Sequence, residues 1–219
     1  MSGKRNGRAL TRGVALAACL AFSADARATL IFSTGQIPGA VNINLVSATG
    51  VATVIGATNQ TVNGSPVGVT FGDAGGNLDA ANGTASITAA DGVAATFTTL
   101  TTTFQSGFGV EVLNFNLNRG AAAGTVTLTG FDQFGGSFTS SAFTLGPGQN
   151  PFVVTAIDGQ LLTRLVLNST APLNTAGQFA VSGVSAIAAV PEPSTLALGG
   201  IGLVGLALGY VRQRRGRIA

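Results

Sequence analysis

The chain has 219 residues, of which 46% are hydrophobic and only 9% are charged, and its formal net charge is +3. Nine of its 11 basic residues lie at or before Arg27 or after Val211, so the segment from Thr29 to Val190 has two arginines, six acidic residues and a net charge of −4. This distribution excludes a basic nucleic-acid-binding surface, and the lack of cysteine in that segment excludes a disulfide framework.

The first 28 residues have the three parts of a secretory signal peptide. A positive region contains Lys4, Arg5, Arg8 and Arg12, and a short apolar run follows from Val14 to Phe22. Ala26-Arg27-Ala28 then offers an A-x-A cleavage site before Thr29. We therefore expect residues 1–28 to be a signal peptide whose cleavage is directed by Ala26 and Ala28.

A second interpretation of this region stays open. Leu16-Ala17-Ala18-Cys19 fits the lipobox pattern, in which Cys19 becomes the lipidated N-terminus of the mature chain. Only six residues separate Arg12 from Cys19, which leaves almost no apolar run before the cysteine. This short spacing favours the signal-peptide interpretation.

Between Thr29 and Val190 the sequence has the two-residue period of β-strands. Val41, Ile43 and Leu45 alternate with mostly polar neighbours, and Thr, Val and Phe are frequent in the stretches 94–104 and 124–131. The stretch 110–118 alternates imperfectly, so a β-bulge is expected there. Further strands are expected at 137–145, 152–157, 161–168 and 178–187.

Short turns separate these expected strands. Asn63-Gly64, Asp91-Gly92 and Asp158-Gly159 favour hairpins, because Asn, Asp and Gly adopt positive φ at low cost. No apolar stripe of helical period appears, so the segment is predicted to be an all-β, antiparallel β-sandwich, with a Gly/Asn/Thr-rich β-helix as the alternative. The predicted core includes Phe97, Leu113, Phe115, Leu128, Leu165 and Val166.

Two groups of residues are candidates for ligand binding. Asp73, Asn77 and Asp79 offer oxygen ligands of the kind that Ca²⁺ prefers, but they lack EF-hand spacing, and we expect a solvated loop rather than a metal site. Phe131, Phe134 and Phe138 offer a sugar-binding face, although phenylalanines in a β-rich chain without tryptophan are more often core residues.

Catalysis is disfavoured by the residue types available. The segment 29–190 contains no histidine, cysteine or lysine, so it has no Ser-His-Asp site and no Schiff-base former. Paired carboxylates alone hydrolyse glycosides in some enzymes, but the six acids here are scattered, mostly at turns. We expect no catalytic residue, no cofactor and no enzymatic activity.

The last 29 residues combine three features in order. Pro191-Glu192-Pro193 is held extended, because each proline fixes its own φ and disfavours helix at the preceding residue. The apolar run 196–211 would form a helix of about 24 Å, somewhat short of the roughly 30 Å core of a bilayer. Arg212, Arg214, Arg215 and Arg217 follow it and predict a cytoplasmic C-terminus.

This arrangement resembles the PEP-CTERM sorting signal, which exosortases recognise in many Gram-negative bacteria. The resemblance rests on Val190 to Thr195, the Gly/Leu-rich apolar run and the arginine cluster. It implies that an exosortase, which supplies the nucleophile, processes the chain near Pro191-Glu192-Pro193, with Glu192 as a recognition element. An ordinary tail anchor with a proline-rich hinge is the alternative.

A second, shorter resemblance concerns the strand before this signal. Phe179 to Ala186 is similar to the closing strand of the jelly-roll ectodomains that often precede the signal, with Ser182 and Gly183 in place of an acidic pair. It implies a jelly-roll-like ectodomain.

These features predict three parts: a signal peptide at 1–28, a jelly-roll-like β-sandwich ectodomain at 29–190, and a sorting signal at 191–219 with a transmembrane helix at 196–211. The expected function is that of a non-enzymatic cell-surface or extracellular-matrix protein, anchored in the inner membrane before processing. Its expected partners are an exosortase-type enzyme, the membrane and an exopolysaccharide, and no nucleic acid. A carbohydrate- or calcium-binding module delivered by the same route is the alternative.

Overall fold

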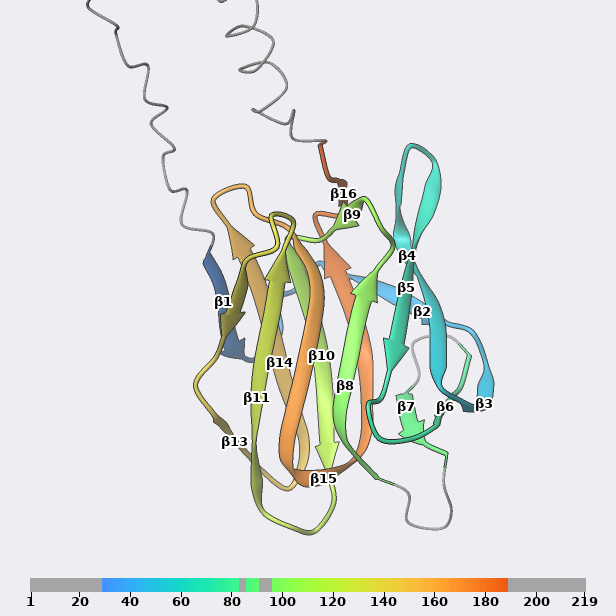
Figure 1. Ribbon diagram of the computed structural model, residues 1–219, viewed down its shortest axis with the longest axis vertical. Helices are drawn as coiled ribbons and strands as arrows, with labels where there is room; N and C mark the ends of the chain where they lie inside the picture. The colour runs from blue at the N-terminus through green and yellow to red at the C-terminus, as the bar shows by residue number, and fades with distance from the viewer. Residues whose placement is uncertain (1–28, 83–85, 91–95, 189–219) are drawn as a thin grey trace, which may run out of the picture.

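The computed structural model describes residues 29–82, 86–90 and 96–188, which form strands and turns and contain no helix. The strands are β1 (Thr29–Thr34), β2 (Val41–Leu45), β3 (Ala48–Val51), β4 (Thr53–Val62), β5 (Ser65–Gly72), β6 (Leu78–Ala80), β7 (Ser86–Ala89), β8 (Phe97–Phe104), β9 (Phe108–Gly109), β10 (Val112–Arg119), β11 (Gly124–Asp132), β12 (Ser137–Thr139), β13 (Phe143–Leu145), β14 (Gly148–Ile157), β15 (Leu162–Ser182) and β16 (Ser185–Ala186). Figure 1 shows their arrangement. The all-β prediction is confirmed.

Fourteen of these strands form one hydrogen-bonded sheet. Its main path is β1–β14–β10–β15–β2–β4–β5–β8, and a further pairing of β8 with β15 closes a ring of five strands. The strand β11 pairs with β15 and carries β12 and β13, while β3, β6 and β7 form a small ladder beside β15. Because one hydrogen-bonded network joins these fourteen strands, the predicted sandwich of two separate sheets is not confirmed. Their pairings are antiparallel, which argues against the β-helix alternative, because its coils pair in parallel.

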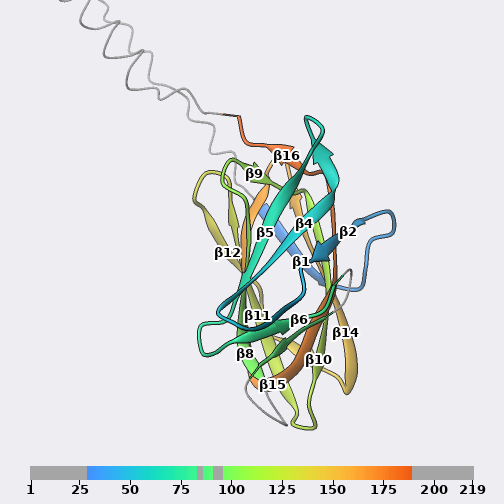
Figure 2. The same ribbon diagram turned by 90° about the vertical axis from the view of Figure 1, so that its right-hand side faces the viewer.

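The strands lie in two layers, one with β8, β11 and the first part of β15, the other with β10, β14 and the last part of β15. The long strand β15 therefore connects the two layers (Figures 1 and 2). Its first part pairs with β8 and β11, whereas its last part pairs with β10 and β2. Between them, Ser169 Oγ donates to Ala171 O at 2.6 Å and accepts from Ala171 N at 3.2 Å, and Pro172 has no N–H to donate. The sequence predicted two separate strands, 161–168 and 178–187; the structure has one strand that bends at 169–172.

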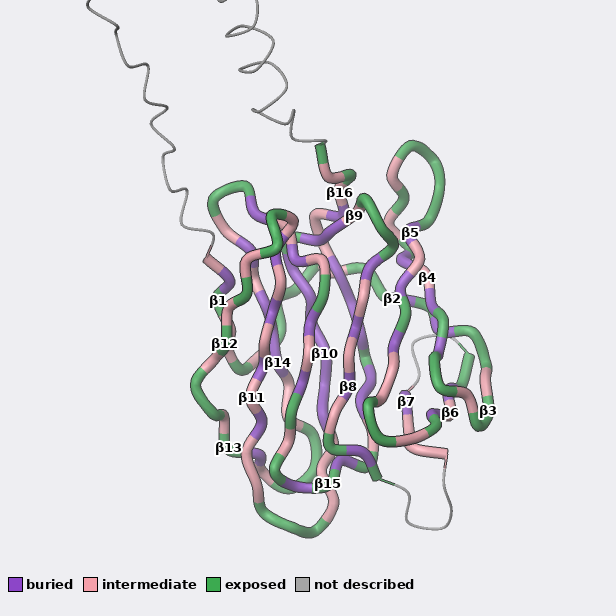
Figure 3. Tube along the Cα trace, viewed as in Figure 1, coloured by how far each residue is buried: buried purple, intermediate pink, exposed green. Residues whose placement is uncertain are grey.

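The core between the layers contains a row of aromatic rings. The centroids are 5.5 Å apart for Phe143 and Phe152, 5.6 Å for Phe152 and Phe115, 6.1 Å for Phe115 and Phe179, and 4.7 Å for Phe179 and Phe71. These separations are typical of favourable ring pairs. The row links β13, β14, β10, β15 and β5 through side chains. Figure 3 shows how buried and exposed positions alternate along these strands.

Five of the six predicted core residues are buried: Phe97, Leu113, Phe115, Leu128 and Leu165. The prediction for Val166 is wrong, because this residue is only half-buried. Successive side chains of a strand point to opposite faces, so with Leu165 in the core its neighbour points outward.

One of the predicted hairpin turns is confirmed, and a second forms a turn without a hairpin. Asn63 and Gly64 have φ of 53° and 79° between the paired strands β4 and β5. Asp158 and Gly159 have φ of 57° and 75°, but the strands that they connect, β14 and β15, each pair with β10 and not with each other. Two successive positive φ values are the signature of a type I′ turn, whose twist matches that of paired strands. The expected turn at Asp91-Gly92 lies outside the described residues.

The targeting segments also lie outside the described residues. They include Cys19, Ala26, Ala28, Pro191, Glu192, Pro193, the expected helix 196–211, Arg212, Arg214, Arg215 and Arg217. Across 29–82, 86–90 and 96–188, no helix has the length and apolar character needed to cross a membrane.

Candidate functional site

The strand β10 carries apolar side chains on one face and carboxamides on the other. Leu113, Phe115 and Leu117 are fully buried in the core. Asn114, Asn116 and Asn118 alternate with them and so lie on the opposite face of the sheet. This face continues across β14 and the last part of β15, the two neighbours of β10.

A β-bulge in β15 adds Gln178 to this face. Asn114 is paired with Ala180 and Asn116 with Gly177, so β15 advances by three residues over the interval in which β10 advances by two. Gln178 has φ of 53°, in the left-handed region that non-glycine residues rarely occupy. Bulges of this kind change the direction of a side chain. A bulge was predicted at 110–118, but the structure places it in the partner strand.

Asn116 lies at the centre of this polar face and is only 7% exposed. Its Nδ2 donates to Gln149 Oε1 and to Gln178 Oε1, both at 3.1 Å. Its Oδ1 is buried and has no hydrogen-bond partner in the described part of the chain. A buried acceptor left unpaired costs about 1 to 3 kcal/mol, so Asn116 offers an acceptor that the fold itself does not use.

A cavity of about 290 Å³ opens beside Asn116. Its polar lining consists of the carboxamides of Asn116, Asn118, Gln149 and Gln178 and the hydroxyls of Ser86 and Thr175. Since Gln149 and Gln178 accept from Asn116 through Oε1, their Nε2 groups remain as donors. The cavity therefore has donors in its lining, beside an unpartnered acceptor, Asn116 Oδ1, that is shielded from solvent.

A second cavity, of about 320 Å³, adjoins the first at Gln178, which lines both. Asn114 holds the loop over it in place: Ile37 N donates to Asn114 Oδ1 at 3.3 Å, and Asn114 Nδ2 donates to Ile37 O at 2.8 Å. Gln36 Nε2 donates to Gln178 Oε1 at 3.4 Å. We call the two cavities together the amide groove.

Among the residues that the structure describes, no charged side chain lines the amide groove. The two arginines of the described segments make their contacts elsewhere. Arg119 donates to the carbonyl oxygens of Gly146, at 2.7 Å, and Ala121, at 3.1 Å. The guanidinium carbon of Arg164 lies 3.7 Å from the ring centroid of Phe131. The groups that the groove offers to a ligand are therefore hydrogen-bonding and apolar rather than charged.

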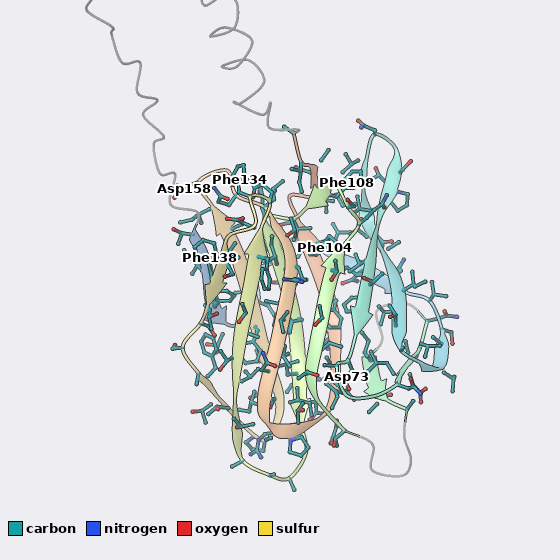
Figure 4. The ribbon with its side chains drawn as sticks, viewed as in Figure 1. Asp73, Phe104, Phe108, Phe134, Phe138 and Asp158 are labelled. Carbon is teal, nitrogen blue, oxygen red and sulfur yellow. The ribbon has the colours of Figure 1, made fainter. Side chains whose placement is uncertain are left out.

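The candidate calcium ligands make separate structural contacts. Asp73 accepts from Thr99 Oγ1, and Asp79 Oδ1 accepts from Gly50 N at 2.7 Å. Asn77 contributes its carbonyl oxygen, which accepts from Ala90 N at 2.9 Å. Among the described residues, no three His, Cys, Asp or Glu side chains lie close enough together to hold a metal ion. Figure 4 places Asp73 at one end of β8, far from Phe104 and Phe108.

The three phenylalanines proposed to bind sugar have different surroundings. Phe138 packs against the core, Phe131 is covered by Arg164, and Phe134 is 60% exposed. They do not present one aromatic face.

The sequence analysis did not predict the amide groove, although three asparagines at alternate positions of β10 were a visible signal. Gln149 and Gln178 gave no such signal, because only the fold brings them to the groove.

Comparison with known protein families identifies the segment that follows β16. Residues 189–215 match the family model described as the PEP-CTERM protein-sorting motif, and this match includes Pro191, Glu192 and Pro193. The chain carries the PEP-CTERM sorting motif. PEP-CTERM marks an exported precursor that is anchored in the membrane and processed by an exosortase. The matched residues exclude the β-rich segment, so the motif describes its delivery.

The other comparisons with known proteins add little to the match with the PEP-CTERM motif. No curated protein matches the sequence. A similar solved structure is the crystal structure of the enzymatically active domain of tailspike protein 4 of bacteriophage CBA120, with 10% sequence identity and a TM-score of 0.27. It covers 72% of this chain, and this chain covers 19% of it. A likeness this weak supports no argument about fold or function.

Proposed function

We propose that this chain is a non-enzymatic cell-surface or extracellular-matrix protein whose β-rich domain stays outside the cell after exosortase processing. The observation that carries the proposal is the position of the sorting motif. The last strand, β16, ends at Ala186, Ile187 N still donates to Gly107 O at 2.8 Å, and the motif begins at residue 189. Cleavage near Pro191-Glu192-Pro193 would therefore release the domain without cutting a strand.

The acidic residues of the domain support a role without catalysis. Asp132 Oδ1 accepts from Phe134 N at 2.8 Å and from Gly136 N at 2.7 Å, and so shapes the turn after β11. Asp73 and Asp79 also accept hydrogen bonds from neighbouring residues. With no histidine, cysteine or lysine between Thr29 and Val190, few groups remain to act as base or nucleophile.

The topology before processing follows from the charges at the C-terminus. The arginine cluster after the apolar run 196–211 favours a precursor with its C-terminus in the cytoplasm and its β-rich domain outside. Of the two alternative functions, carbohydrate binding is favoured by the uncharged amide groove, which offers hydrogen-bonding groups of the kind that sugar hydroxyls use.

Cell fractionation tests the proposal. An epitope tag placed in the exposed loop 121–123, between β10 and β11, leaves both ends of the chain intact. In cells with an active exosortase we expect the tagged chain in the matrix or surface fraction, shortened at its C-terminus. In cells without the exosortase we expect the full-length chain in the membrane. Equal distribution in the two strains would refute the proposal.

A further inference from the structure

We propose that the amide groove binds a neutral polysaccharide chain. The inference rests on the proposed function, because it names the matrix component that the exported domain contacts. It starts from the chemistry of the first cavity: four carboxamides and two hydroxyls with no charge. A carboxamide both donates and accepts, and so does each hydroxyl of a sugar, so the two kinds of group can pair in either direction.

Asn116 gives the groove a specific requirement. Its Oδ1 is buried and unpartnered in the described part of the chain, while its Nδ2 is fixed by Gln149 and Gln178. The group that completes this arrangement is therefore a donor, and a sugar hydroxyl is one once the side chains of the lining shift enough to expose Oδ1. The same hydroxyl can accept from Gln149 Nε2 or Gln178 Nε2, so that it both donates and accepts a hydrogen bond in the groove.

The shape of the groove favours a chain over a single sugar. Its cavities, of about 290 and 320 Å³, are each near the lower limit of about 300 Å³ for ligand sites, and they meet at Gln178. The second cavity is lined partly by Ile37, Pro38 and Ala180, which offer apolar contacts to the C–H faces of sugar rings. A polymer with neighbouring rings can fill both cavities and contact Gln178 between them.

Other polymers fit less well. An acidic polysaccharide would find no arginine or lysine in the lining, because Arg119 and Arg164 make their contacts elsewhere. Burying an unpaired carboxylate against neutral amides is costly. A protein partner is expected to meet an apolar core with a polar rim, whereas the centre of this groove is the polar side chain of Asn116.

Affinity electrophoresis of the full-length chain in detergent tests the inference. The gels contain dextran, galactomannan or soluble starch as neutral probes and alginate as the acidic probe. We expect at least one neutral polysaccharide to retard the chain and alginate to have no effect at the same concentration. Retardation by alginate alone, or by none of the four probes, would overturn the inference.

Variants locate the binding. Gln149→Ala removes an exposed side chain at the rim of the first cavity, so folding is not at risk, and Asn116→Ala removes the central amide. One lost neutral hydrogen bond weakens binding on the order of 3- to 10-fold, and we expect each variant to show this loss. Asn44→Ala is the matched control, because Asn44 is exposed and bonds to Asn59 on another strand.

The outcomes separate this inference from the proposed function. If Gln149→Ala and Asn116→Ala are retarded as strongly as the unsubstituted chain, the groove is not the binding site. If the chain is processed and reaches the matrix but no neutral polysaccharide retards it, the groove inference fails and the proposed function stands. If the chain is never processed, the proposed function fails, whatever the gels show.

Discussion

Asn114 and Asn116 lie two residues apart on the same face of β10, yet only Asn114 has both of its side-chain polar atoms hydrogen-bonded. Asn114 holds the backbone of Ile37 through two hydrogen bonds, whereas Asn116 Oδ1 has no partner among the described residues. The two residues are buried to a similar degree, at 4% and 7% exposure. We infer that Asn114 has a structural role and that Asn116 serves the groove.

The structural role of Asn114 can be measured directly. Asn114→Ala leaves the N–H and C=O of Ile37 without their side-chain partners. We expect the free energy of unfolding to fall by about 1 to 3 kcal/mol, since each hydrogen bond contributes about 0.5 to 1.5 kcal/mol. Urea denaturation of the purified chain measures the change. Asn44→Ala, an exposed control, should stay within about 0.5 kcal/mol of the unsubstituted chain, and an equal loss in both variants would contradict this role.

Gly124 is required by a close approach between β11 and the bend of β15. A Cβ at this position would lie 2.3 Å from Ala171 Cβ and 2.9 Å from Ala171 N. Gly124→Ala should therefore lower the free energy of unfolding by about 1 to 3 kcal/mol through overpacking. The control is Gly72→Ala, whose new Cβ would meet nothing closer than Ala52 O at 3.7 Å. Thermal melts compare the two, and a Gly124→Ala variant as stable as Gly72→Ala would show that the bend can move.

Calcium should leave the thermal stability unchanged. Asp73 and Asp79 already accept hydrogen bonds from Thr99 and from Gly50 N, and Asn82 Oδ1 accepts from Ser47 N at 2.8 Å. A ligand that binds only the native state adds about 2.7 kcal/mol at 100 times its dissociation constant. We therefore expect no shift in Tm at millimolar Ca²⁺. An upward shift that disappears in Asp79→Ala would establish a metal site.

We expect the processing step to depend on Glu192. Glu192→Ala removes one charge from the sorting motif and leaves the apolar run 196–211 and the arginine cluster intact. We expect membrane insertion to continue, full-length precursor to accumulate and the released form to decrease. Immunoblots of membrane and secreted fractions measure both. If Glu192→Ala is released like the unsubstituted chain, Glu192 is not a recognition element.

The sequence predicts where the strands of this domain lie better than it predicts which strands pair with each other. The alternation in β10 correctly predicted Leu113 and Phe115 as core residues, because burial on one face repeats every two residues. The same pattern could not show that Gln149 and Gln178 would meet Asn116, because those contacts depend on strand order. It also could not show the bend in β15, where Ser169 and Ala171 close a local turn that leaves the strand continuous.

The course of β15 determines how the membrane-anchored precursor carries mechanical load. The chain leaves the domain after β16, which pairs with β9, so we infer that tension from the membrane anchor passes through β16 before it reaches β15. This strand is flanked by β10 on one side and by β2 and β7 on the other. Hydrogen bonds on both sides of β15 therefore resist this tension, whereas an edge strand would have such bonds on one side only.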